Sequence, residues 1–299
     1  MKALITGGSG FVGTYLRAHC TEAGDDVIAV DRSGPEPLDI TDRDAIHDSL
    51  VYHQPEVVYH LAAMSHVGES WNDPTGVLRV NVEGTAHVLA AARAANVRRT
   101  VVIGSAEEYG QVDERDLPLS EDAPLRPSSP YGVSKIAASF LALQAHLAYG
   151  LDTIRVRAFS HTGPGQSDRF LVPALAGRIA KAEREDRDEI RVGALDPVRD
   201  LSDVRDVVRA YRLLALHGTA GAVYNVCSGT GVSVRDIADR LVASANRALR
   251  VTVDPELVRP VEVPRLIGDG SRLRAATGWS PEFGLDDTLR AVLEDARTR

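Results

Sequence analysis

A glycine-rich turn, set between a short apolar strand pattern and a helix pattern, most constrains the fold of this chain. In the stretch LITGGSGFVGTYL, Gly7, Gly10 and Gly13 lie between a strand predicted at residues 3–6 and a helix that runs to about residue 23. Glycines let backbone N–H groups and the positive end of the helix approach a pyrophosphate, where side chains would clash. The turn therefore predicts a dinucleotide-binding site. Its predicted cofactor contacts are Gly7, Gly10, Phe11, Val12 and Gly13.

Strand and helix patterns alternate regularly through the first half of the chain. Short apolar runs predict strands at residues 3–6, 26–30, 57–62, 100–104 and 153–159. Helical patterns occupy residues 41–53, with Thr41 as the expected cap, 81–95 and 131–149. Such alternation is typical of a parallel sheet covered by helices on both faces. We therefore expect an α/β fold with a Rossmann-type, doubly wound parallel sheet.

The rhythm changes after residue 159, where the turn HTGPGQ interrupts the alternation. Beyond it the patterns predict helices at 171–187, 203–216 and 233–245, strands at 190–192 and 223–226, and a final helix near the C-terminus. We expect an NAD(P)-binding Rossmann domain at residues 1–160 and a smaller C-terminal α/β substrate lobe at 161–299. Segments at about 194–230 are expected to return to the first domain.

Composition and charge exclude several classes of function. The chain of 299 residues carries a net charge of −8, so nucleic acid and anionic membranes are poor partners for it. Its two cysteines, Cys20 and Cys227, form no CxxC motif and have no histidine cluster nearby, which argues against a disulfide framework or a structural zinc site. The apolar runs are too short for a signal peptide or a membrane span. We expect a cytoplasmic protein without a metal site.

An acidic residue at the end of the second predicted strand supports the dinucleotide interpretation. Asp31 can accept hydrogen bonds from an adenosine ribose, and its charge would repel a 2′-phosphate, which favours NAD(H). Arg32 follows directly and can pair with such a phosphate, so NADP(H) stays open. Asp39 and Ile40, in LDITD, are placed either to contact the adenine ring or to form a plain helix-capping turn.

Three residues that end the third predicted strand belong beside the glycine turn. Leu61, Ala62 and Ala63 come from the motif HLAA, and small side chains there would let a cofactor lie against the sheet. Core packing explains Ala62 equally well.

The segment RPSSPYGVSK delivers a tyrosine and a lysine to the start of a predicted helix. Tyr131 and Lys135 are four residues apart, so both project from one face of that helix. The two are either a buried aromatic and a solvated lysine, or an acid whose pKa is tuned by a neighbouring cation. The ordinary pKa of tyrosine is about 10, and a nearby ammonium group together with an oxidised nicotinamide would lower it.

Four motifs, GGSGFVG, HLAA, SAEEYG and YGVSK, occur in the order and spacing that resemble the extended short-chain dehydrogenase/reductase family. The resemblance covers nearly the whole chain and implies that Ser105, Tyr131 and Lys135 are the catalytic residues. Tyr131 would move a proton as hydride passes to or from nicotinamide. Lys135 would also bind the nicotinamide ribose, and Ser105 would hydrogen-bond the reacting oxygen. A non-catalytic dinucleotide sensor on the same fold is the alternative from another class.

The second half of the chain resembles enzymes that modify nucleoside-diphosphate sugars, above all the GDP-mannose branch of 4,6-dehydratases and 4-keto-6-deoxymannose reductases. The stretches HTGPGQ and HGTAGAVYNVCSG are closer to the reductases. The resemblance implies that Arg199 pairs with the diphosphate and that Arg259 and Glu262 hold the nucleotide. A surface ion pair is the alternative for Arg259 and Glu262. Ser160, a further expected substrate contact, stands where the family usually carries an asparagine.

Glu107 decides which reaction the resemblance implies. In the 4,6-dehydratases a glutamate two places after the catalytic Ser/Thr removes the proton at C5, but Ala106 stands where dTDP-sugar dehydratases carry an aspartic acid. An acid at the Glu107 position also occurs among the reductases. We therefore expect NAD(P)H-dependent reduction of the C4 ketone of a GDP-4-keto-6-deoxyhexose. A GDP-mannose-type 4,6-dehydratase with tightly bound NAD, and a C4-epimerase, are the alternatives.

The remaining expectations concern assembly and three polar residues. The helices at 81–95 and 131–149 are rich in alanine, and in the resembling family the equivalent helices pair across a two-fold axis into a four-helix bundle. A homodimer is therefore expected. Glu108 is expected in packing or at the surface, and His66 and His161 as substrate contacts or structural residues.

Overall fold

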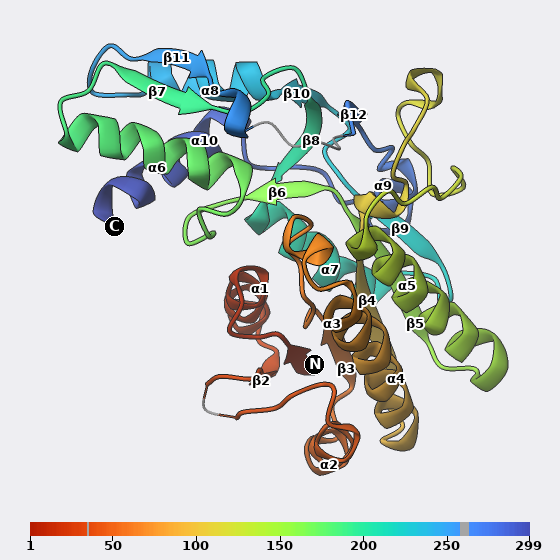
Figure 1. The fold of residues 1–299 in the computed structure, drawn as a ribbon. Coiled ribbons are helices and arrows are strands. Elements are labelled where there is room, and N and C mark those ends of the chain that lie inside the picture. Colours follow the sequence, from red (N-terminus) through yellow and green to blue (C-terminus); the bar gives the residue numbers. More distant parts are fainter. Residues whose placement is uncertain (35, 258–262) are drawn as a thin grey trace.

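The computed structural model describes residues 1–34, 36–257 and 263–299. Its centre is a six-stranded sheet in which all neighbouring strands run parallel, in the order β2-β1-β3-β4-β5-β9 (Figure 1). Its strands are β1 (Lys2–Thr6), β2 (Asp26–Val30), β3 (Val57–His60), β4 (Arg99–Ser105), β5 (Thr153–Ala158) and β9 (Val223–Val226). The chain moves outward from β1 in both directions, which confirms the predicted doubly wound sheet. Ligands bind such sheets in the crevice at the carboxyl ends of the strands, where the order reverses.

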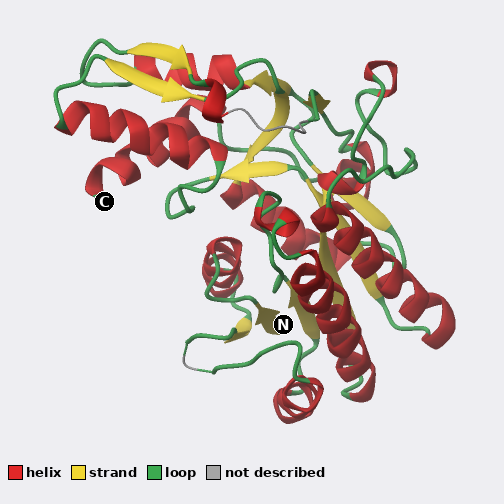
Figure 2. Cartoon of the chain, in the orientation of Figure 1, coloured by secondary structure: helices red, strands yellow, loops and turns green. Residues whose placement is uncertain are grey.

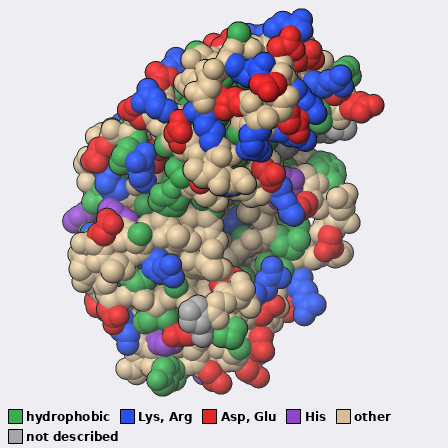
Figure 3. All heavy atoms as spheres, turned by 90° about the vertical axis from the view of Figure 1, so that its left-hand side faces the viewer, with side chains coloured by type: hydrophobic (Ala, Val, Ile, Leu, Met, Phe, Trp, Pro, Cys, Tyr) green, Lys and Arg blue, Asp and Glu red, His purple; other side chains and the backbone are tan. Residues whose placement is uncertain are grey.

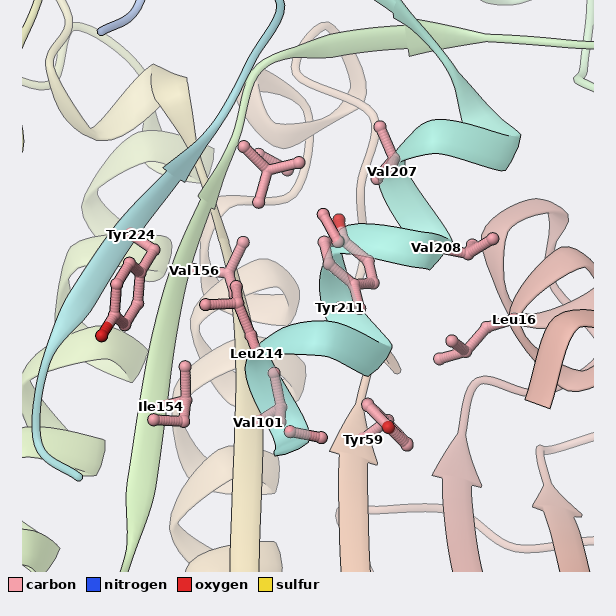
Figure 4. Packing of buried hydrophobic residues seen from close by; sticks show 14 of the residues in the cluster. Leu16, Tyr59, Val101, Ile154, Val156, Val207, Val208, Tyr211, Leu214 and Tyr224 are labelled. Carbon is pink, nitrogen blue, oxygen red and sulfur yellow. The ribbon is translucent and has the colours of Figure 1, made fainter. Parts of the chain in front are cut away.

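Both faces of this sheet are buried because successive residues of its strands enter two different apolar clusters. Ala3 and Ile5 pack into one cluster, whereas Leu4 packs into the other. One face is covered by α1 (Phe11–Glu22) and α7 (Val204–His217), and the other by α2 (Arg43–His53), α4 (Gly84–Ala94) and α5 (Pro130–Tyr149) (Figure 2). Figure 4 shows the first cluster, in which Tyr211 and Leu214 of α7 lie against the strands. The apolar strand runs thus reflect burial on both sides.

Helix α5 begins and ends where its sequence dictates. The Ser129 hydroxyl accepts a hydrogen bond from the backbone N–H of Gly132 at 3.1 Å, and Pro130 occupies the first helical position. Gly150 ends the helix in the left-handed conformation, with φ at +69°. The N-terminal cap at Ser129 thus sets where α5 begins, and the first turns of the helix carry Tyr131 and Lys135 at the carboxyl edge of the sheet.

Two expected helix starts are wrong. Asp42 rather than Thr41 caps α2, because its carboxylate accepts the backbone N–H groups of Asp44 and Ala45. The helix expected from residue 81 begins earlier, as α3 (Pro74–Leu78), and runs through a π-helical turn, η2 (Arg79–Glu83), into α4. Asp73 caps α3 through the backbone N–H of Gly76.

A second lobe packs its own apolar cluster beside the first lobe, meaning the six-stranded sheet with its helices. The second lobe contains α6 (Leu171–Arg184), β7 (Glu189–Val192), α8 (Val234–Ala243), β11 (Arg250–Val253) and α10 (Leu285–Thr298). Between the lobes lies a small sheet of β6 (Ser160–Thr162), β8 (Val198–Asp203), β10 (Gly231–Ser233) and β12 (Arg265–Leu266). The sequence patterns did not predict these four strands, which are short and carry many polar residues. A boundary at residue 160 stays a prediction.

Several segments after residue 200 belong to the first lobe. Helix α7 contacts α1 and β4, and β9 extends the six-stranded sheet beyond β5. Helix α9 (Ser271–Thr277) packs on α7 and β9. Trp279 follows it and is buried, with its indole N–H donating to the carbonyl oxygen of Asp206 at 3.0 Å. Among the described residues, no helix combines the length and apolar character needed to cross a bilayer.

Candidate active site

The predicted site residues gather at the carboxyl edge of the parallel sheet. The glycine turn follows β1, residues 61–63 follow β3, and Ser105 ends β4. The first turn of α5 begins at the same edge (Figure 1). In Figure 3 the surface is hollowed between the lower and the upper part of the molecule. This is the place where open α/β sheets bind their ligands.

The glycine turn forms a cradle with no room for side chains. Gly7 has φ at +72°, and a Cβ there would lie 2.8 Å from the backbone nitrogen of Ala62. A Cβ at Gly13 would lie 2.2 Å from the carbonyl oxygen of Gly7. Gly10 caps α1 without any side-chain hydrogen bond, so the first N–H groups of that helix can face an anion. The cradle fits a dinucleotide pyrophosphate, and Ala62 lies beside it as predicted.

Asp31 is tied to the glycine turn. Its Oδ2 accepts the Ser9 hydroxyl at 2.6 Å and the Ser9 backbone N–H at 3.2 Å, and its Oδ1 accepts the backbone N–H of Arg32 at 2.8 Å. Arg32 itself is exposed. The carboxylate therefore sits at the end of β2, within the same hydrogen-bonded unit as the cradle.

The LDITD turn has the contacts of a plain turn. Asp39 accepts the Thr41 backbone N–H and hydroxyl at 2.9 and 2.8 Å, and these bonds lower the pKa of Asp39. Ile40 is buried, with its side chain against Gly84. An adenine contact for Asp39 and Ile40 stays a prediction.

The structure brings Ser105, Tyr131 and Lys135 together. The side chains of Ser105 and Tyr131 share a hydrogen bond. The Lys135 Nζ donates to the carbonyl oxygen of Ile103 at 2.8 Å and lies 5.8 Å from the centre of the Tyr131 ring. Tyr131 and Lys135 are both buried. The lysine is therefore not the solvated helical charge that was the alternative for it.

Burial dominates the electrostatics of the pair. Burial raises the pKa of Tyr131, the charges of Glu107 and Glu108 raise it further, and the hydrogen bond with Ser105 acts in the opposite direction. Burial also lowers the pKa of Lys135 to about 8, against an upward effect of Glu108. The predicted lowering of the Tyr131 pKa by Lys135 together with an oxidised nicotinamide stays a prediction, because in the chain by itself desolvation dominates. In the chain by itself, burial therefore favours the neutral phenol.

The SAEEYG segment forms a short 3-10 turn, η3 (Ala106–Glu108), capped by Ser105. The Ser105 hydroxyl accepts the backbone N–H of Glu107 at 3.2 Å, and Glu108 Oε1 accepts the backbone N–H of Ser105 at 3.0 Å. Glu107 is half-buried, and its charge acts on Tyr131. Glu108 is fully buried and paired with Arg157, a partner that sequence reasoning missed.

Two of the expected substrate contacts, Ser160 and Arg199, lie on the small inter-lobe sheet. Ser160 opens β6 and pairs in register with Leu201 of β8. Arg199, on β8, donates to the carbonyl oxygen of Val198 at 3.0 Å. Arg259 and Glu262 lie outside the described residues.

The two candidate histidines lie where the lobes meet. His161 stacks on Phe11 with ring centres 6.5 Å apart, and burial lowers its pKa. His66 packs edge-on against Phe170, with ring centres 5.9 Å apart. Next to it, Glu69 and Arg169 form an ion pair. Sequence reasoning missed this pair because its partners are far apart in the chain.

Comparison with known proteins places the whole chain among nucleotide-sugar enzymes. Residues 36–292 match the family model described as GDP-mannose 4,6 dehydratase. The GDP-6-deoxy-D-mannose reductase of Pseudomonas aeruginosa is 38% identical over 300 residues, covering 100% of this chain and 98% of that protein.

Two solved structures share the fold over the full length. RMD from Pseudomonas aeruginosa complexed with NADPH has a TM-score of 0.91 and 37% identity, covering 100% of this chain and 99% of that one. The UDP-glucose 4-epimerase of Thermotoga maritima with UDP-glucose has a TM-score of 0.92 and 25% identity, with the same coverage. The similarity thus extends to enzymes of more than one reaction type.

Proposed function

Because the chain belongs to the GDP-mannose 4,6-dehydratase family of extended short-chain dehydrogenase/reductases, we propose that it reduces the C4 ketone of a GDP-4-keto-6-deoxyhexose. It is an NAD(P)-dependent enzyme that acts on a nucleotide sugar. The observation that carries the choice of reaction is the buried, apolar side chain of Ala106, which stands next to Ser105 where dTDP-sugar dehydratases carry a proton donor.

A protonated phenol is the form that ketone reduction needs. The Tyr131 hydroxyl donates its proton to the carbonyl oxygen, and the Ser105 hydroxyl hydrogen-bonds the same oxygen and orients it. Bound NAD(P)H supplies the hydride. In this proposal Lys135, anchored on the Ile103 carbonyl oxygen, holds the nicotinamide ribose and presents a positive charge to the phenolate that remains.

The proposed cofactor residues are the glycine cradle, Asp31 and the residues that end β3. The uncapped start of α1 offers backbone N–H groups to the pyrophosphate. Asp31 offers a carboxylate to the adenosine ribose, which favours NAD(H), while the exposed Arg32 leaves NADP(H) possible. Relatives are found with either cofactor, as NADPH in RMD and NAD in a UDP-glucose 4-epimerase of Thermus thermophilus.

The proposed substrate residues lie on the inter-lobe sheet and in the segment after η5 (Pro255–Leu257). Arg199 would pair with the diphosphate and Ser160 would contact phosphate or sugar. Arg259 and Glu262 are proposed to hold the nucleotide.

Dehydration is the second candidate, and Glu107 is the observation that favours it. The carboxylate of Glu107 is half-buried and its charge acts on Tyr131, which places an acid beside the proposed proton donor. However, Ala106 is buried and packs with Tyr109 and Phe159, so the position used by dTDP-sugar dehydratases for a proton donor carries an apolar side chain. This favours reduction.

One experiment separates the two reactions. The purified protein is incubated with GDP-4-keto-6-deoxymannose and NADH or NADPH, and separately with GDP-mannose and NAD⁺ alone. We expect stoichiometric loss of NAD(P)H with the ketone and formation of a GDP-6-deoxyhexose. Formation of a 4-keto product from GDP-mannose without added reductant would overturn reduction in favour of dehydration.

We also propose a homodimer formed through α5. Val133, Phe140 and Leu147 recur every seven residues along this helix, and their side chains are 46%, 52% and 75% exposed. A groove lies between the last two of these side chains and is lined by Phe140, Leu143, Gln144, Leu147 and Ala148. An apolar helix stripe of this kind fits a second copy of the same helix across a two-fold axis. Cys20 and Cys227 are free and buried, and a cytoplasmic location remains part of the proposal.

A further inference from the structure

A fully buried carboxylate lies directly behind the site. Glu108 has 0% exposure, and its two oxygens have different partners. Oε1 accepts the backbone N–H of Ser105 at 3.0 Å, and Oε2 accepts the Arg157 Nε at 2.9 Å. A Cβ at Gly104 would lie 2.2 Å from Oε1, so the carboxylate fills the space that this glycine leaves open. The chain thus builds a place for an acid next to Ser105.

The same ion pair connects Ser105 to the segment between β4 and α5 and to β9. Arg157 Nη1 donates to the Tyr109 hydroxyl at 3.0 Å and to the carbonyl oxygen of Glu121 at 2.8 Å. The Tyr109 hydroxyl donates to Asn225 Oδ1 at 2.7 Å, and the Asn225 amide donates to the carbonyl oxygen of Leu119 at 2.8 Å. Each of these polar groups is buried and paired, as a rigid network requires.

The charge of Glu108 acts on the two residues proposed for proton transfer. On α5 it acts on Tyr131 and on Lys135, and for Lys135 it is the charge that opposes the effect of burial. On β5 it faces Arg157 and acts on Arg155.

Other titratable groups border the same residues. Glu107 acts electrostatically on Tyr131, and Tyr131 acts on Tyr211 of α7. Burial lowers the pKa of His60 to about 3, and the positive charge of Lys135 acts in the same direction, so His60 stays neutral.

We propose that Glu108 is a positioning residue of the reaction, which holds the backbone of Ser105 and places a buried, Arg157-paired carboxylate behind Tyr131 and Lys135. A buried ion pair adds little to stability compared with apolar residues of the same volume, so its place behind the catalytic residues points to a role in the site. The inference rests on the roles proposed above for Ser105, Tyr131 and Lys135.

The direction of the effect follows from the sign of the charge. A carboxylate near Tyr131 favours the neutral phenol, and near Lys135 it favours the ammonium group. Replacing the carboxylate with an amide, in Glu108→Gln, therefore lowers the pKa of both groups. Lys135, with its pKa of about 8, is the group that titrates within the accessible range, so the basic limb of the pH profile moves to lower pH by roughly 1 unit.

The titration of Lys135 can be measured without any substrate. The chain has three lysines, Lys2, Lys135 and Lys181, so selective isotope labelling of lysine gives three side-chain NMR signals, and Lys135→Arg identifies the relevant one. We expect Lys135 to titrate near the value of about 8 in the full-length protein and at lower pH in Glu108→Gln. The signals of Lys2 and Lys181 serve as internal references and should not move.

Glu121→Gln is the matched control. Glu121 is also a buried carboxylate of the same network, bonded to the backbone N–H of Asn225 at 2.8 Å, and it contacts Arg272 rather than the catalytic residues. We expect Glu121→Gln to leave the Lys135 titration and the pH profile where they are. Glu108→Asp keeps the charge and should restore most of the titration shift.

The outcomes are separable. The proposal is overturned if a folded Glu108→Gln protein leaves the Lys135 midpoint unchanged, or if Glu121→Gln moves it as far. If Glu108→Gln does not fold, the double variant Glu108→Gln/Arg157→Met removes both charges and leaves no orphan ion, and the same criterion applies. A failure of the proposed reductase function appears differently, as absence of turnover by the unaltered protein while its Lys135 titration still responds to Glu108.

Discussion

The Lys135 ammonium nitrogen lies 5.8 Å from the centre of the Tyr131 ring and donates its hydrogen bond to the carbonyl oxygen of Ile103. Lys135 extends from the start of α5 to β4 and is held there beside the phenol. Because both side chains are buried, each loses solvation in its charged form. The arrangement favours a neutral phenol that gives up its proton only when a reacting oxygen accepts it.

Removing the Tyr131 hydroxyl tests the proton donor. We expect Tyr131→Phe to lower kcat for ketone reduction by about 100- to 10,000-fold, the usual size of a general-acid contribution. The dissociation constants of NADH and NADPH should change little, because the cradle is intact. Steady-state kinetics and fluorescence titration of the cofactor measure both quantities. A variant with nearly full turnover would show that the proton comes from another group.

The buried Lys135 is expected to lower the free energy of unfolding. Its folded pKa of about 8 lies below the ordinary value of 10.5, so between these values the unfolded chain binds more protons and stability rises with pH. Below the folded value the full cost is present. Lys135→Met should therefore raise the free energy of unfolding near neutral pH by about 1–3 kcal/mol and flatten its alkaline pH dependence, while abolishing activity. Chemical denaturation at several pH values measures this, and equal stability of the two proteins would contradict it.

Asp31 and Arg32 are expected to set cofactor preference in opposite directions. Asp31→Asn keeps an acceptor for Ser9 but removes the charge that repels a 2′-phosphate, so kcat/KM for NADPH relative to NADH should rise roughly tenfold, a difference of about 1.4 kcal/mol. Arg32→Ala should lower the same ratio. Kinetics with both cofactors tests the pair, and a ratio that does not respond to either substitution would remove both residues from the ribose site.

The cradle cannot accept a methyl group at Gly13. A Cβ there would lie 2.2 Å from the carbonyl oxygen of Gly7, so Gly13→Ala should displace the turn and weaken cofactor binding by at least roughly tenfold. Gly177→Ala is the control, because that glycine lies in α6 with open space around it. It should stabilise the protein by about 0.5–1 kcal/mol without affecting the cofactor. Calorimetric titration measures the cofactor affinity of both variants. Equal affinity would contradict the proposal that the glycine turn binds the cofactor.

An acidic residue on the outer stripe of α5 should separate the proposed dimer. We expect Leu147→Asp to convert the protein from dimer to monomer in sedimentation velocity, because the charge would be buried against the partner helix. Tyr52→Asp, at a site on α2 that is 82% exposed, should leave the assembly unchanged. A monomer before any substitution would refute the interface.

Much of the fold was predictable because burial leaves a mark on sequence. The strand at residues 57–60 is apolar at nearly every position, since both of its faces are covered. The start of α5 was readable from Ser129 and Pro130. By contrast, β8 reads VRDLSD, and its polar residues are accepted because Asp200 is paired with the backbone N–H groups of Ser228 and Gly229. Such compensation depends on distant segments and is invisible locally.

The sequence predicted which residues form the site but not the pKa shifts of its side chains. Ser105, Tyr131 and Lys135 were named from the resemblance, and the structure brings them together. The upward shift of the Tyr131 pKa in the chain by itself was not predicted, because the sequence does not show how completely the pair is desolvated. Glu108 could not be ranked as a buried acid, since its partner Arg157 is a distant residue on another strand.

The return of α7 and β9 to the first sheet has a consequence for anyone who wishes to exchange specificity between relatives. The polypeptide crosses from one lobe to the other repeatedly, so the substrate half is not a cassette that can be transplanted at a single junction. In a chimera joined near residue 160, β9 and Trp279 would come from the protein that supplies the C-terminal part. The edge strand of the six-stranded sheet would then come from a different parent than the other five strands. A working chimera will need several junctions, so that each segment comes from the same parent as the lobe against which it packs.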